Sequence, residues 1–316
     1  MKALVTGAAG FIGSHLTSAL LDLGAEVTGV DCFTDYYPRA IKDANLEVNR
    51  GRAGFRFVEA ALQHTLLDAL LEGRTHVFHL AAQAGVRKSW GQDFRVYTDN
   101  NIDATQRLLE ACVGRALRRF VYASSSSVYG DHVAIPMRED ALPQPVSPYG
   151  VTKLAAEQLC YLYHVNHGVP ATSLRYFTVY GPRQRPDMAF NRFIRAALRK
   201  EPVTLYGDGE QTRDLTYVSD AVAATIAAGE RGAPGRAYNV GGGSRVSVNQ
   251  VIEIVGRLAG RPLDVRREPA QKGDMRDTYA DTSLARADLG FAPRVSLQEG
   301  LEAEYRWLST APALAS

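Results

Sequence analysis

Cysteine is scarce in this chain of 316 residues, and its three cysteines lie far apart, at Cys32, Cys112 and Cys160. That number and separation exclude a disulfide framework and give no pair with the spacing of zinc ligands. Reduced thiols are typical of the cytoplasm, so we expect a cytoplasmic protein. Because the cysteines lack the spacing of metal ligands, we expect no metal site.

Long apolar runs and an excess of one charge are absent as well. No apolar stretch approaches the ~18 residues that span a membrane. Lys2 leads directly into a strand-like segment, so we expect no signal peptide. The 36 basic residues nearly balance the 34 acidic ones, with a net charge of +2. We therefore expect neither a membrane nor a nucleic acid as partner. The apolar fraction of 46% indicates an ordinary globular chain, and the length predicts about two domains.

The first part of the chain alternates regularly between short apolar segments and helical segments. Segments typical of strands are 2–6, 26–30, 55–58, 75–80, 119–123 and 171–176, and helical segments are 14–23, 66–71, 101–112 and 153–164. A βα series of this kind predicts an α/β fold. Its core is a Rossmann-type doubly wound parallel sheet, covered by helices on both faces.

The rhythm changes beyond Gly181. Helical segments at 191–200 and 247–258 then alternate with short strands at 203–205 and 237–240. We predict that residues 1–180 form the Rossmann domain and residues 181–316 a smaller C-terminal α/β substrate-binding lobe, with some segments crossing between the two. Open parallel sheets bind ligands at the carboxyl ends of their strands, so the cleft is expected between sheet and lobe.

A glycine-rich turn joins the first predicted strand to the first predicted helix. Gly7, Gly10 and Gly13 recur at every third position. Glycine lets the main chain approach a pyrophosphate, and the helix N-terminus adds free N–H groups. The next strand ends at Asp31, whose carboxylate suits the ribose hydroxyls of NAD and repels the extra phosphate of NADP. A glycine turn that serves packing alone is the alternative, but strand, turn, helix, strand and acid together favour an NAD site.

Tyr149 and Lys153 lie one helical turn apart, just after Ser147 and Pro148. Proline fits the first turn of a helix, so the two side chains share one helix face. Unperturbed tyrosine has a pKa of about 10 and is a poor base at neutral pH. A neighbouring ammonium favours the phenolate, which makes the pair a usable proton acceptor. On a solvated helix face the same pair has no function, so the surrounding motifs decide between the two interpretations.

Five motifs in this order resemble the extended short-chain dehydrogenase/reductases, and among them the NAD-dependent epimerases and dehydratases of nucleotide sugars. They are residues 6–13, 79–84, Ser124-Ser125, Tyr149-x-x-x-Lys153 and 175–177, spread over nearly the whole chain. The resemblance implies that Tyr149 is the catalytic base. It also implies that Lys153 binds the nicotinamide ribose and lowers the tyrosine pKa, that Ser125 hydrogen-bonds the reacting hydroxyl, and that Asn101 is structural.

The same resemblance implies tightly bound NAD and a homodimer formed through two helices of the Rossmann domain. One position departs from the family pattern, because Ala61 stands where an acidic residue usually meets the adenine. That hydrogen bond is therefore missing, while the cofactor remains NAD. The implied cofactor contacts are Gly7, Gly10, Phe11, Ile12, Gly13, Asp31, Leu62, Ala81, Tyr149, Lys153 and Tyr176.

The segment from Ser124 to Ser127 indicates the type of reaction. Related 4,6-dehydratases carry Asp-Glu here and related UDP-glucuronate decarboxylases carry a glutamate, whereas this segment holds serines and no carboxylate. Elimination of water is poorly supported without an acid. Oxidation at C4 of the sugar and return of the same hydride need only the tyrosine and the nicotinamide. The segment therefore favours a 4-epimerase.

The sequences around Tyr36, Thr178 and Arg185 resemble UDP-glucuronate 4-epimerases, which implies reversible conversion of UDP-glucuronate to UDP-galacturonate through a 4-keto intermediate. That intermediate is a β-keto acid and loses carbon dioxide readily. Hydroxyls of Ser126, Ser127 and Thr178 would hold its carboxylate in an unproductive orientation. Arg185 would pair with the carboxylate or gate rotation of the sugar, or it is a plain loop arginine. Further substrate contacts, near the UDP end, are Arg192, Arg213 and Arg276, and Arg87 is an additional candidate at the substrate or the cofactor.

Three alternatives stay open at this point. A UDP-glucose/UDP-galactose 4-epimerase is the nearest, although those enzymes usually have Asn in place of Thr178. A UDP-glucuronate decarboxylase is disfavoured by the missing glutamate. An NAD-binding regulatory or scaffold protein with a dead site is disfavoured by the intact Ser125, Tyr149 and Lys153.

Overall fold

A seven-stranded sheet forms the centre of the computed structural model, which describes residues 1–310. Its strand order is β11-β6-β5-β4-β1-β2-β3, and every neighbouring pair is parallel. The strands are β1 (Lys2–Thr6), β2 (Glu26–Asp31), β3 (Phe55–Glu59), β4 (His76–His79), β5 (Arg119–Ser125), β6 (Ala171–Tyr176) and β11 (Ala237–Val240). The structure confirms the predicted Rossmann-type doubly wound sheet.

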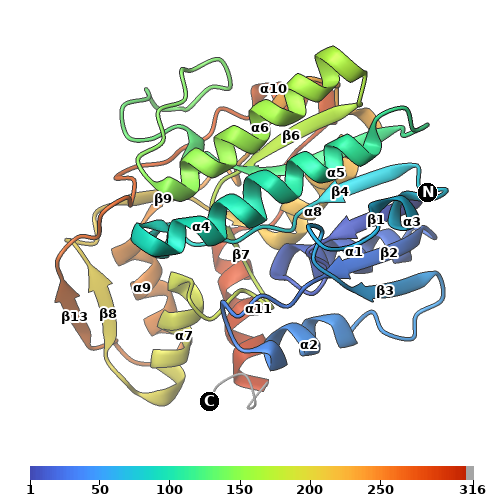
Figure 1. Ribbon diagram of the computed structural model, residues 1–316. Coiled ribbons are helices and arrows are strands. Elements are labelled where there is room, and N and C mark those ends of the chain that lie inside the picture. The colour runs from blue at the N-terminus through green and yellow to red at the C-terminus, as the bar shows by residue number, and fades with distance from the viewer. Residues whose placement is uncertain (311–316) are drawn as a thin grey trace.

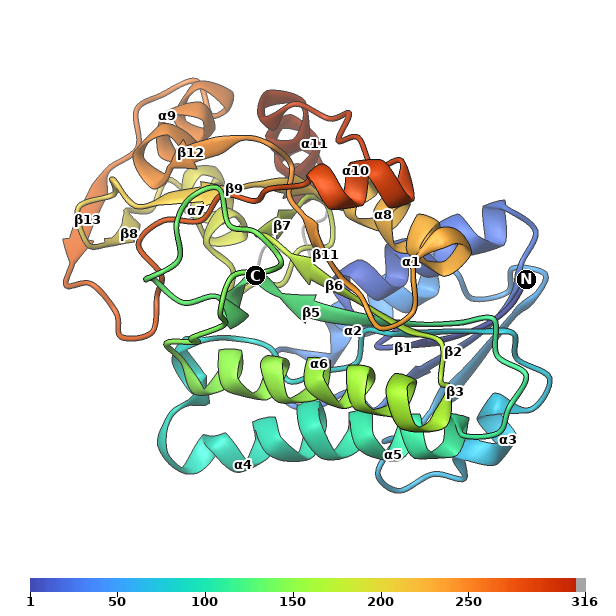
Figure 2. The same ribbon diagram turned by 90° about the horizontal axis from the view of Figure 1, so that it is seen from above.

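Helices cover both faces of this sheet (Figures 1 and 2). Because side chains alternate along a strand, Ala3 and Val5 pack in the core with α1 and α8, whereas Leu4 packs in the core with α3, α5 and α6. The helices are α1 (Phe11–Asp22) and α8 (Val218–Arg231) on one face, and α3 (Leu67–Leu71), α5 (Ala104–Cys112) and α6 (Pro148–His167) on the other; α2 (Arg39–Glu47) lies beside α1.

A smaller lobe lies at one side of the carboxyl ends of these strands (Figure 2). It has its own apolar core, in which Phe193, Val203, Val255 and Leu301 are buried. Two short sheets frame it, one pairing β8 with β13 in parallel and one pairing β9 with β12 antiparallel. Its elements are α7 (Ala189–Arg199), β8 (Val203–Tyr206), β9 (Thr212–Asp214), β12 (Arg245–Ser247), α9 (Val248–Leu258), β13 (Val265–Glu268) and α11 (Leu297–Thr310).

The strand at 237–240 was predicted to lie in this lobe. In the structure it joins the large sheet instead. Ala237 pairs with Ser173 and Val240 with Tyr176, so β11 extends the sheet beyond β6. The strand follows α8, which packs against α1 and so returns the chain to the Rossmann layer. A short apolar strand carries no local mark of its partner, so the sequence predicted that some segments cross between the two parts without identifying this strand as one of them. The division between residues 180 and 181 stays a prediction. The last six residues of the predicted lobe, 311–316, lie outside the described residues.

The helix predicted at 101–112 starts within a wider π-helical turn, Thr98–Asp103, which continues α4 (Phe94–Tyr97) into α5. Asn101 in this turn is buried, accepts a hydrogen bond from Gln83 N at 2.7 Å and donates to Gln83 O at 3.0 Å. It also donates to Thr152 Oγ1 of α6 at 2.9 Å. Asn101 therefore ties the segment after β4 to α6. No helix among residues 1–310 is long and apolar enough to cross a membrane.

Candidate active site

The glycine turn between β1 and α1 is shaped to admit a dinucleotide. Gly7 has a φ of +72°, and a Cβ on Gly13 would lie 2.0 Å from the main-chain oxygen of Gly7. Larger residues are therefore excluded from the point where α1 starts. No side chain caps α1 at Gly10, which leaves its first N–H groups for an anion such as a diphosphate.

Asp31 is fixed beside this turn at the end of β2. Its Oδ2 accepts a hydrogen bond from Ala9 N at 3.1 Å, and its Oδ1 accepts one from Phe33 N at 2.9 Å. Burial raises the pKa of Asp31, while these N–H donors and the Lys42 ammonium oppose the rise. The carboxylate thus has a defined orientation next to the glycine turn, as binding to a ribose requires.

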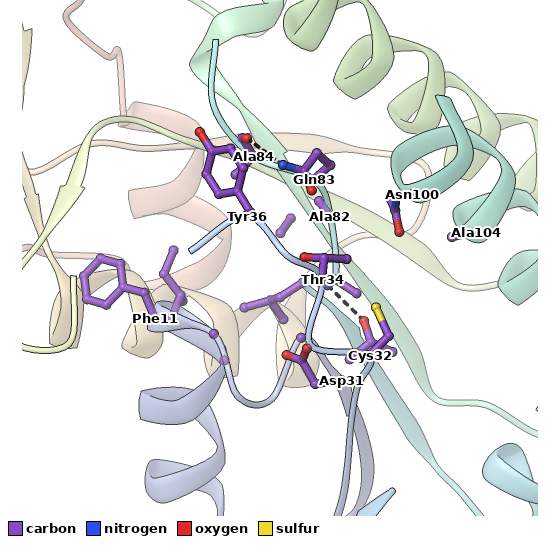
Figure 3. Close-up of a pocket in the computed structure, with 18 of the residues that line it drawn as sticks. Phe11, Asp31, Cys32, Thr34, Tyr36, Ala82, Gln83, Ala84, Asn100 and Ala104 are labelled. Atoms are coloured by element: carbon purple, nitrogen blue, oxygen red, sulfur yellow. Dashed lines mark hydrogen bonds between the residues drawn. The ribbon is translucent and has the colours of Figure 1, made fainter. Parts of the chain in front are cut away.

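One cavity runs along the carboxyl ends of the strands, and every residue predicted to bind the cofactor lines it. Figure 3 shows Phe11 of α1, Asp31 at the end of β2, Tyr36 after β2 and Gln83 after β4 around this cavity. The combination of glycine cradle, uncapped helix and ribose-binding acid fits NAD. Residues at the cavity that the sequence analysis missed are Cys32, Thr34, Tyr37, Lys42, Gln63, Gln83 and Asn100. Most of them follow a predicted strand, and this position after a strand was the signal in the sequence that could have identified them.

Lys153 reaches the cavity from α6. Ser147 caps this helix by accepting a hydrogen bond from Gly150 N at 3.1 Å, and Pro148 occupies the first turn as predicted. The Lys153 ammonium donates to the main-chain oxygen of Ala123 at 2.6 Å and lies 4.8 Å from the centre of the Tyr122 ring. Burial lowers the pKa of Lys153 to about 8.

Tyr149 also faces the cavity, one turn before Lys153 on α6. Burial raises its pKa, whereas the charge of Arg185 and a hydrogen bond with Ser125 lower it. The sequence analysis assigned the opposing charge to Lys153. In the structure Arg185 is a further charge that lowers the pKa of Tyr149, while the Lys153 ammonium donates to Ala123, and the effect of Lys153 on Tyr149 stays a prediction.

The serine segment forms a tight turn against the start of α6. Ser125 ends β5, and its Oγ accepts a hydrogen bond from Ser127 N at 3.1 Å. Ser126 is buried and Ser127 half-buried. A Cβ on Gly150 would lie 2.4 Å from the main-chain oxygen of Ser127. The turn therefore packs on α6 directly after Tyr149, and it brings hydroxyls but no carboxylate.

Thr178 approaches this region from the neighbouring strand. Ser125 pairs with Tyr176 in the large sheet, so Thr178 follows two residues beyond that pair. The main-chain oxygen of Thr178 accepts a hydrogen bond from Thr216 N at 2.9 Å, which holds the short connection between β6 and β7 (Val179–Tyr180).

Arg185 lines the same cavity, on the loop that leads to α7. Its Nε and Nη2 donate to the two carboxylate oxygens of Asp187 at 3.0 and 2.9 Å. Its guanidinium lies 5.6 Å from the centre of the Tyr36 ring, and the Tyr36 hydroxyl donates to Asp187 at 3.3 Å. Burial lowers the pKa of Arg185, but the Asp187 carboxylate outweighs burial and the net shift is upward. Neither partner of Arg185 was anticipated from the sequence.

The remaining predicted substrate arginines lie away from the cofactor cavity, around Tyr206 at the end of β8. Arg87 and Arg192 place their guanidinium groups 4.2 and 5.7 Å from the centre of the Tyr206 ring. Arg87 also pairs with Asp274 at 2.7 Å. These two cation–π contacts make Tyr206 the centre of this cluster. The sequence analysis missed Tyr206, because a single aromatic after a strand carries no specific signal.

Arg213 and Arg276 belong to the same region. Burial lowers the pKa of Arg213, while Asp274, Asp131 and Asp277 oppose that shift. Arg213 Nη1 donates to the main-chain oxygen of Arg276 at 3.1 Å, and Arg276 pairs with Asp208 at 3.0 Å. The cluster concentrates guanidinium groups at the lobe, as a diphosphate site requires.

Comparison with known proteins identifies a family and several similar proteins. Residues 3–241 match the NAD dependent epimerase/dehydratase family. The UDP-glucuronate 4-epimerase of Thermodesulfobacterium geofontis is 39% identical over 309 residues, covering 96% of this chain and 95% of that protein. An uncharacterized UDP-glucose epimerase, YtcB of Bacillus subtilis, is 45% identical over 312 residues and 98% of both chains.

A solved structure is equally similar. The UDP-glucuronic acid 4-epimerase of Bacillus cereus, in complex with UDP-glucuronic acid and NAD, superposes with a TM-score of 0.96 at 46% identity. The match covers 98% of this chain and 99% of that one. On the strength of the family match, the glycine cradle and the Tyr149 site, the chain belongs to the NAD dependent epimerase/dehydratase family.

Proposed function

We propose that this protein is an NAD-dependent nucleotide-sugar 4-epimerase that interconverts UDP-glucuronate and UDP-galacturonate through a 4-keto intermediate. The observation that carries the proposal is the turn Ser125–Ser127, which packs beside Tyr149 and offers hydroxyls without an acid. The similarity over the full length to UDP-glucuronate 4-epimerases of two bacteria supports it.

The cavity at the strand ends is the proposed NAD site. When bound there, the nicotinamide accepts a hydride from C4 of the sugar and returns it to the other face, so no net oxidation occurs. The glycine turn and α1 hold the diphosphate, and Asp31 holds the adenosine ribose. Lys153 holds the nicotinamide ribose from α6.

Tyr149 is the proposed base that removes the proton from the C4 hydroxyl. Its pKa is raised by burial, and the charge of Arg185 partly offsets this. Ser125 also lowers the pKa of this phenol, and in this scheme it hydrogen-bonds the reacting hydroxyl. The same groups return the proton when the sugar is reduced from its other face, since each step is reversible.

Ser126, Ser127 and Thr178 are the proposed ligands of the sugar carboxylate. Hydroxyls bind a carboxylate by donating hydrogen bonds, whereas a glutamate would repel it. Loss of carbon dioxide from the 4-keto intermediate requires the C5–C6 bond to align with the carbonyl π system. Fixed hydroxyls prevent that alignment, and Arg185 adds a positive charge to the lining of the cavity.

The arginine cluster around Tyr206 is the proposed anchor for UDP. Arg87, Arg192, Arg213 and Arg276 gather there, and three of them come from the predicted lobe of residues 181–316. A 4-keto sugar that rotates inside the site to present its other face must stay attached through its nucleotide. Binding energy at the UDP end therefore supports chemistry at the sugar end.

We also propose that the protein acts as a homodimer in the cytoplasm. The outer face of α6 exposes large apolar side chains of a kind that monomers usually bury, and α4 exposes two more. These residues are Val151, Tyr161, Leu162 and Val165 of α6 and Phe94 and Val96 of α4. The cysteines Cys32, Cys112 and Cys160 are free thiols, which suits a reducing compartment.

The decisive experiment is incubation of the purified protein with UDP-glucuronate and no added reductant, with products resolved by NMR and mass spectrometry. We expect UDP-galacturonate at unchanged mass. Loss of the mass of carbon dioxide would identify a decarboxylase. Tyr149→Phe serves as the control, because it keeps the ring and removes the base. Activity of this variant close to wild type would refute the assignment of Tyr149.

UDP-glucose/UDP-galactose 4-epimerisation is the second candidate. The similarity to the UDP-glucose epimerase of Bacillus subtilis favours it. The same assay with UDP-glucose distinguishes the two, since the carboxylate ligands proposed above give no advantage to a neutral sugar. A higher kcat/KM for UDP-glucose than for UDP-glucuronate would make the neutral sugar the substrate.

A further inference from the structure

A buried ion pair lies beneath the serine turn. Arg175 of β6 and Glu157 of α6 are 4% and 5% exposed, and Arg175 Nη2 lies 2.6 Å from Glu157 Oε1. The Arg175 Nε contacts the same carboxylate, so the contact is bidentate. Burial lowers the pKa of Arg175, but its contacts with Glu157 outweigh burial and the net shift is upward. The mechanism proposed above uses neither residue.

The pair holds both ends of the turn. On the near side, Ser124 donates from Oγ to Glu157 Oε2 at 2.5 Å. On the far side, Arg175 Nη1 donates to the Tyr129 hydroxyl at 2.8 Å, and that hydroxyl donates to Asn239 Oδ1 at 2.7 Å. The Tyr129 ring lies against the guanidinium, with its centre 4.8 Å from the Arg175 Cζ.

Ser125 to Val128 therefore stand between two residues that are fastened to one ion pair. Fold stability alone is a weak explanation for such an arrangement, because burying two charges costs free energy that their attraction often does not recover. A polar network in which every member is satisfied instead fixes one geometry. Here the geometry that is fixed is that of the turn bearing Ser126 and Ser127.

We propose that Glu157, Arg175 and Tyr129 are positioning residues that hold the serine hydroxyls against the carboxylate of a UDP-uronate. The proposal rests on the function proposed above. When the turn moves, the carboxylate rotates and the C5–C6 bond aligns with the C4 carbonyl. That bond then breaks, its electron pair moves into the carbonyl, carbon dioxide leaves and C5 takes a proton. Return of the hydride to C4 gives a UDP-pentose, with no further oxidant or reductant.

The test compares two tyrosine variants. Tyr129→Phe removes only the hydroxyl that Arg175 and Asn239 share. Tyr238→Phe is the matched control, because the Tyr238 hydroxyl is also bonded twice, to Ala233 N at 3.1 Å and Asp288 at 2.9 Å. Tyr238 lies on β11 with its ring buried, and it does not line the cofactor cavity.

The ratio of UDP-pentose to UDP-galacturonate formed from UDP-glucuronate is measured for both variants and wild type, together with Tm and NAD content. We expect Tyr129→Phe to raise this ratio by about tenfold, the scale of one lost hydrogen bond to a charged group. Tyr238→Phe is expected to lower Tm similarly and leave the ratio unchanged. Equal ratios in all three proteins would overturn the proposal, as would an equal rise in both variants.

A binding measurement separates this proposal from the proposed function. In a Tyr149→Phe background, which cannot turn over, Tyr129→Phe is expected to weaken UDP-glucuronate about fivefold more than UDP-glucose. Equal weakening would overturn the positioning role even if wild type is a 4-epimerase. Absence of UDP-galacturonate from wild type, with the selective weakening intact, would instead refute only the proposed reaction.

Discussion

The Lys153 ammonium lies 2.6 Å from the main-chain oxygen of Ala123, to which it donates a hydrogen bond. This contact fastens α6 to the end of β5, directly before the serine turn. Because the amine is almost completely buried, its pKa falls from 10.5 to about 8. The residue proposed to hold the nicotinamide ribose is therefore close to losing its charge at mildly alkaline pH.

The sign of the resulting pH dependence follows from proton linkage. Between about pH 8 and 10.5 the unfolded chain holds a proton on Lys153 that the folded protein has lost, so the contribution of Lys153 to stability rises with pH in this window. Below pH 8 the cost of burying the charge is complete, at most about 3 kcal/mol. We expect Lys153→Met to lack this rise and to bind NAD more weakly at neutral pH. Denaturant unfolding and NAD titration across this pH range check both points; parallel stability curves for variant and wild type would contradict the first.

Arg185 is expected to act on the rate through the pKa of Tyr149. Its positive charge lowers that pKa, which burial has raised. Arg185→Met removes the charge, so the phenolate forms at higher pH and the rising limb of the kcat/KM profile moves to higher pH. Arg185→Lys keeps a charge and is expected to move the limb less. A pH series of initial rates distinguishes this role from binding alone, which would lower kcat/KM without moving the limb.

Asp31 is expected to set the choice of cofactor. Its carboxylate is fixed by Ala9 N and Phe33 N beside the glycine turn, where it would repel the 2′-phosphate of NADP. We expect Asp31→Ser to shift the ratio of the Kd values for NAD and NADP toward NADP by at least about tenfold. Asp35→Ser removes the same charge from an exposed position four residues along the loop and serves as control. An equal shift in both variants would assign the effect to net charge rather than to the Asp31 contact.

Local pattern was sufficient for much of this fold and site. The apolar run of β1, the glycine spacing and the Ser147-Pro148 start of α6 each dictate short-range structure, and the structure agrees with all three. Those elements also carry Tyr149 and Lys153 to the cavity, because the ends of parallel strands meet at one edge.

What the sequence did not reveal depends on contacts between distant segments. β11 pairs with β6 across a sequence gap that the intervening α8 bridges, and nothing local names that partner. The pairing of Arg185 with Asp187 is local, but its contact with Tyr36 joins a loop of the Rossmann domain to a loop of the predicted lobe. The pKa of Tyr149 depends on this three-dimensional arrangement, which is why the contribution of Arg185 was not predicted.

Thr178 and Ser127 provide the most direct test of how decarboxylation is avoided. Both approach Tyr149 from separate strands, one after β6 and one after β5, and neither brings a charge. Thr178→Ala or Ser127→Ala removes one donor to the sugar carboxylate, which frees the carboxylate to rotate while Tyr149 continues to form the 4-keto intermediate. We expect UDP-pentose to appear beside UDP-galacturonate, with each variant retaining measurable epimerisation.

Thr178→Ser is the matched control for that experiment, since it keeps the hydroxyl and loses only a methyl group. It is expected to form no more UDP-pentose than wild type. If Thr178→Ala slows epimerisation but forms no UDP-pentose, the hydroxyl orients the sugar without restraining its carboxylate. If Thr178→Ser also releases UDP-pentose, packing of the methyl group against the connection between β6 and β7, and not hydrogen bonding, would be what keeps the C5–C6 bond out of alignment.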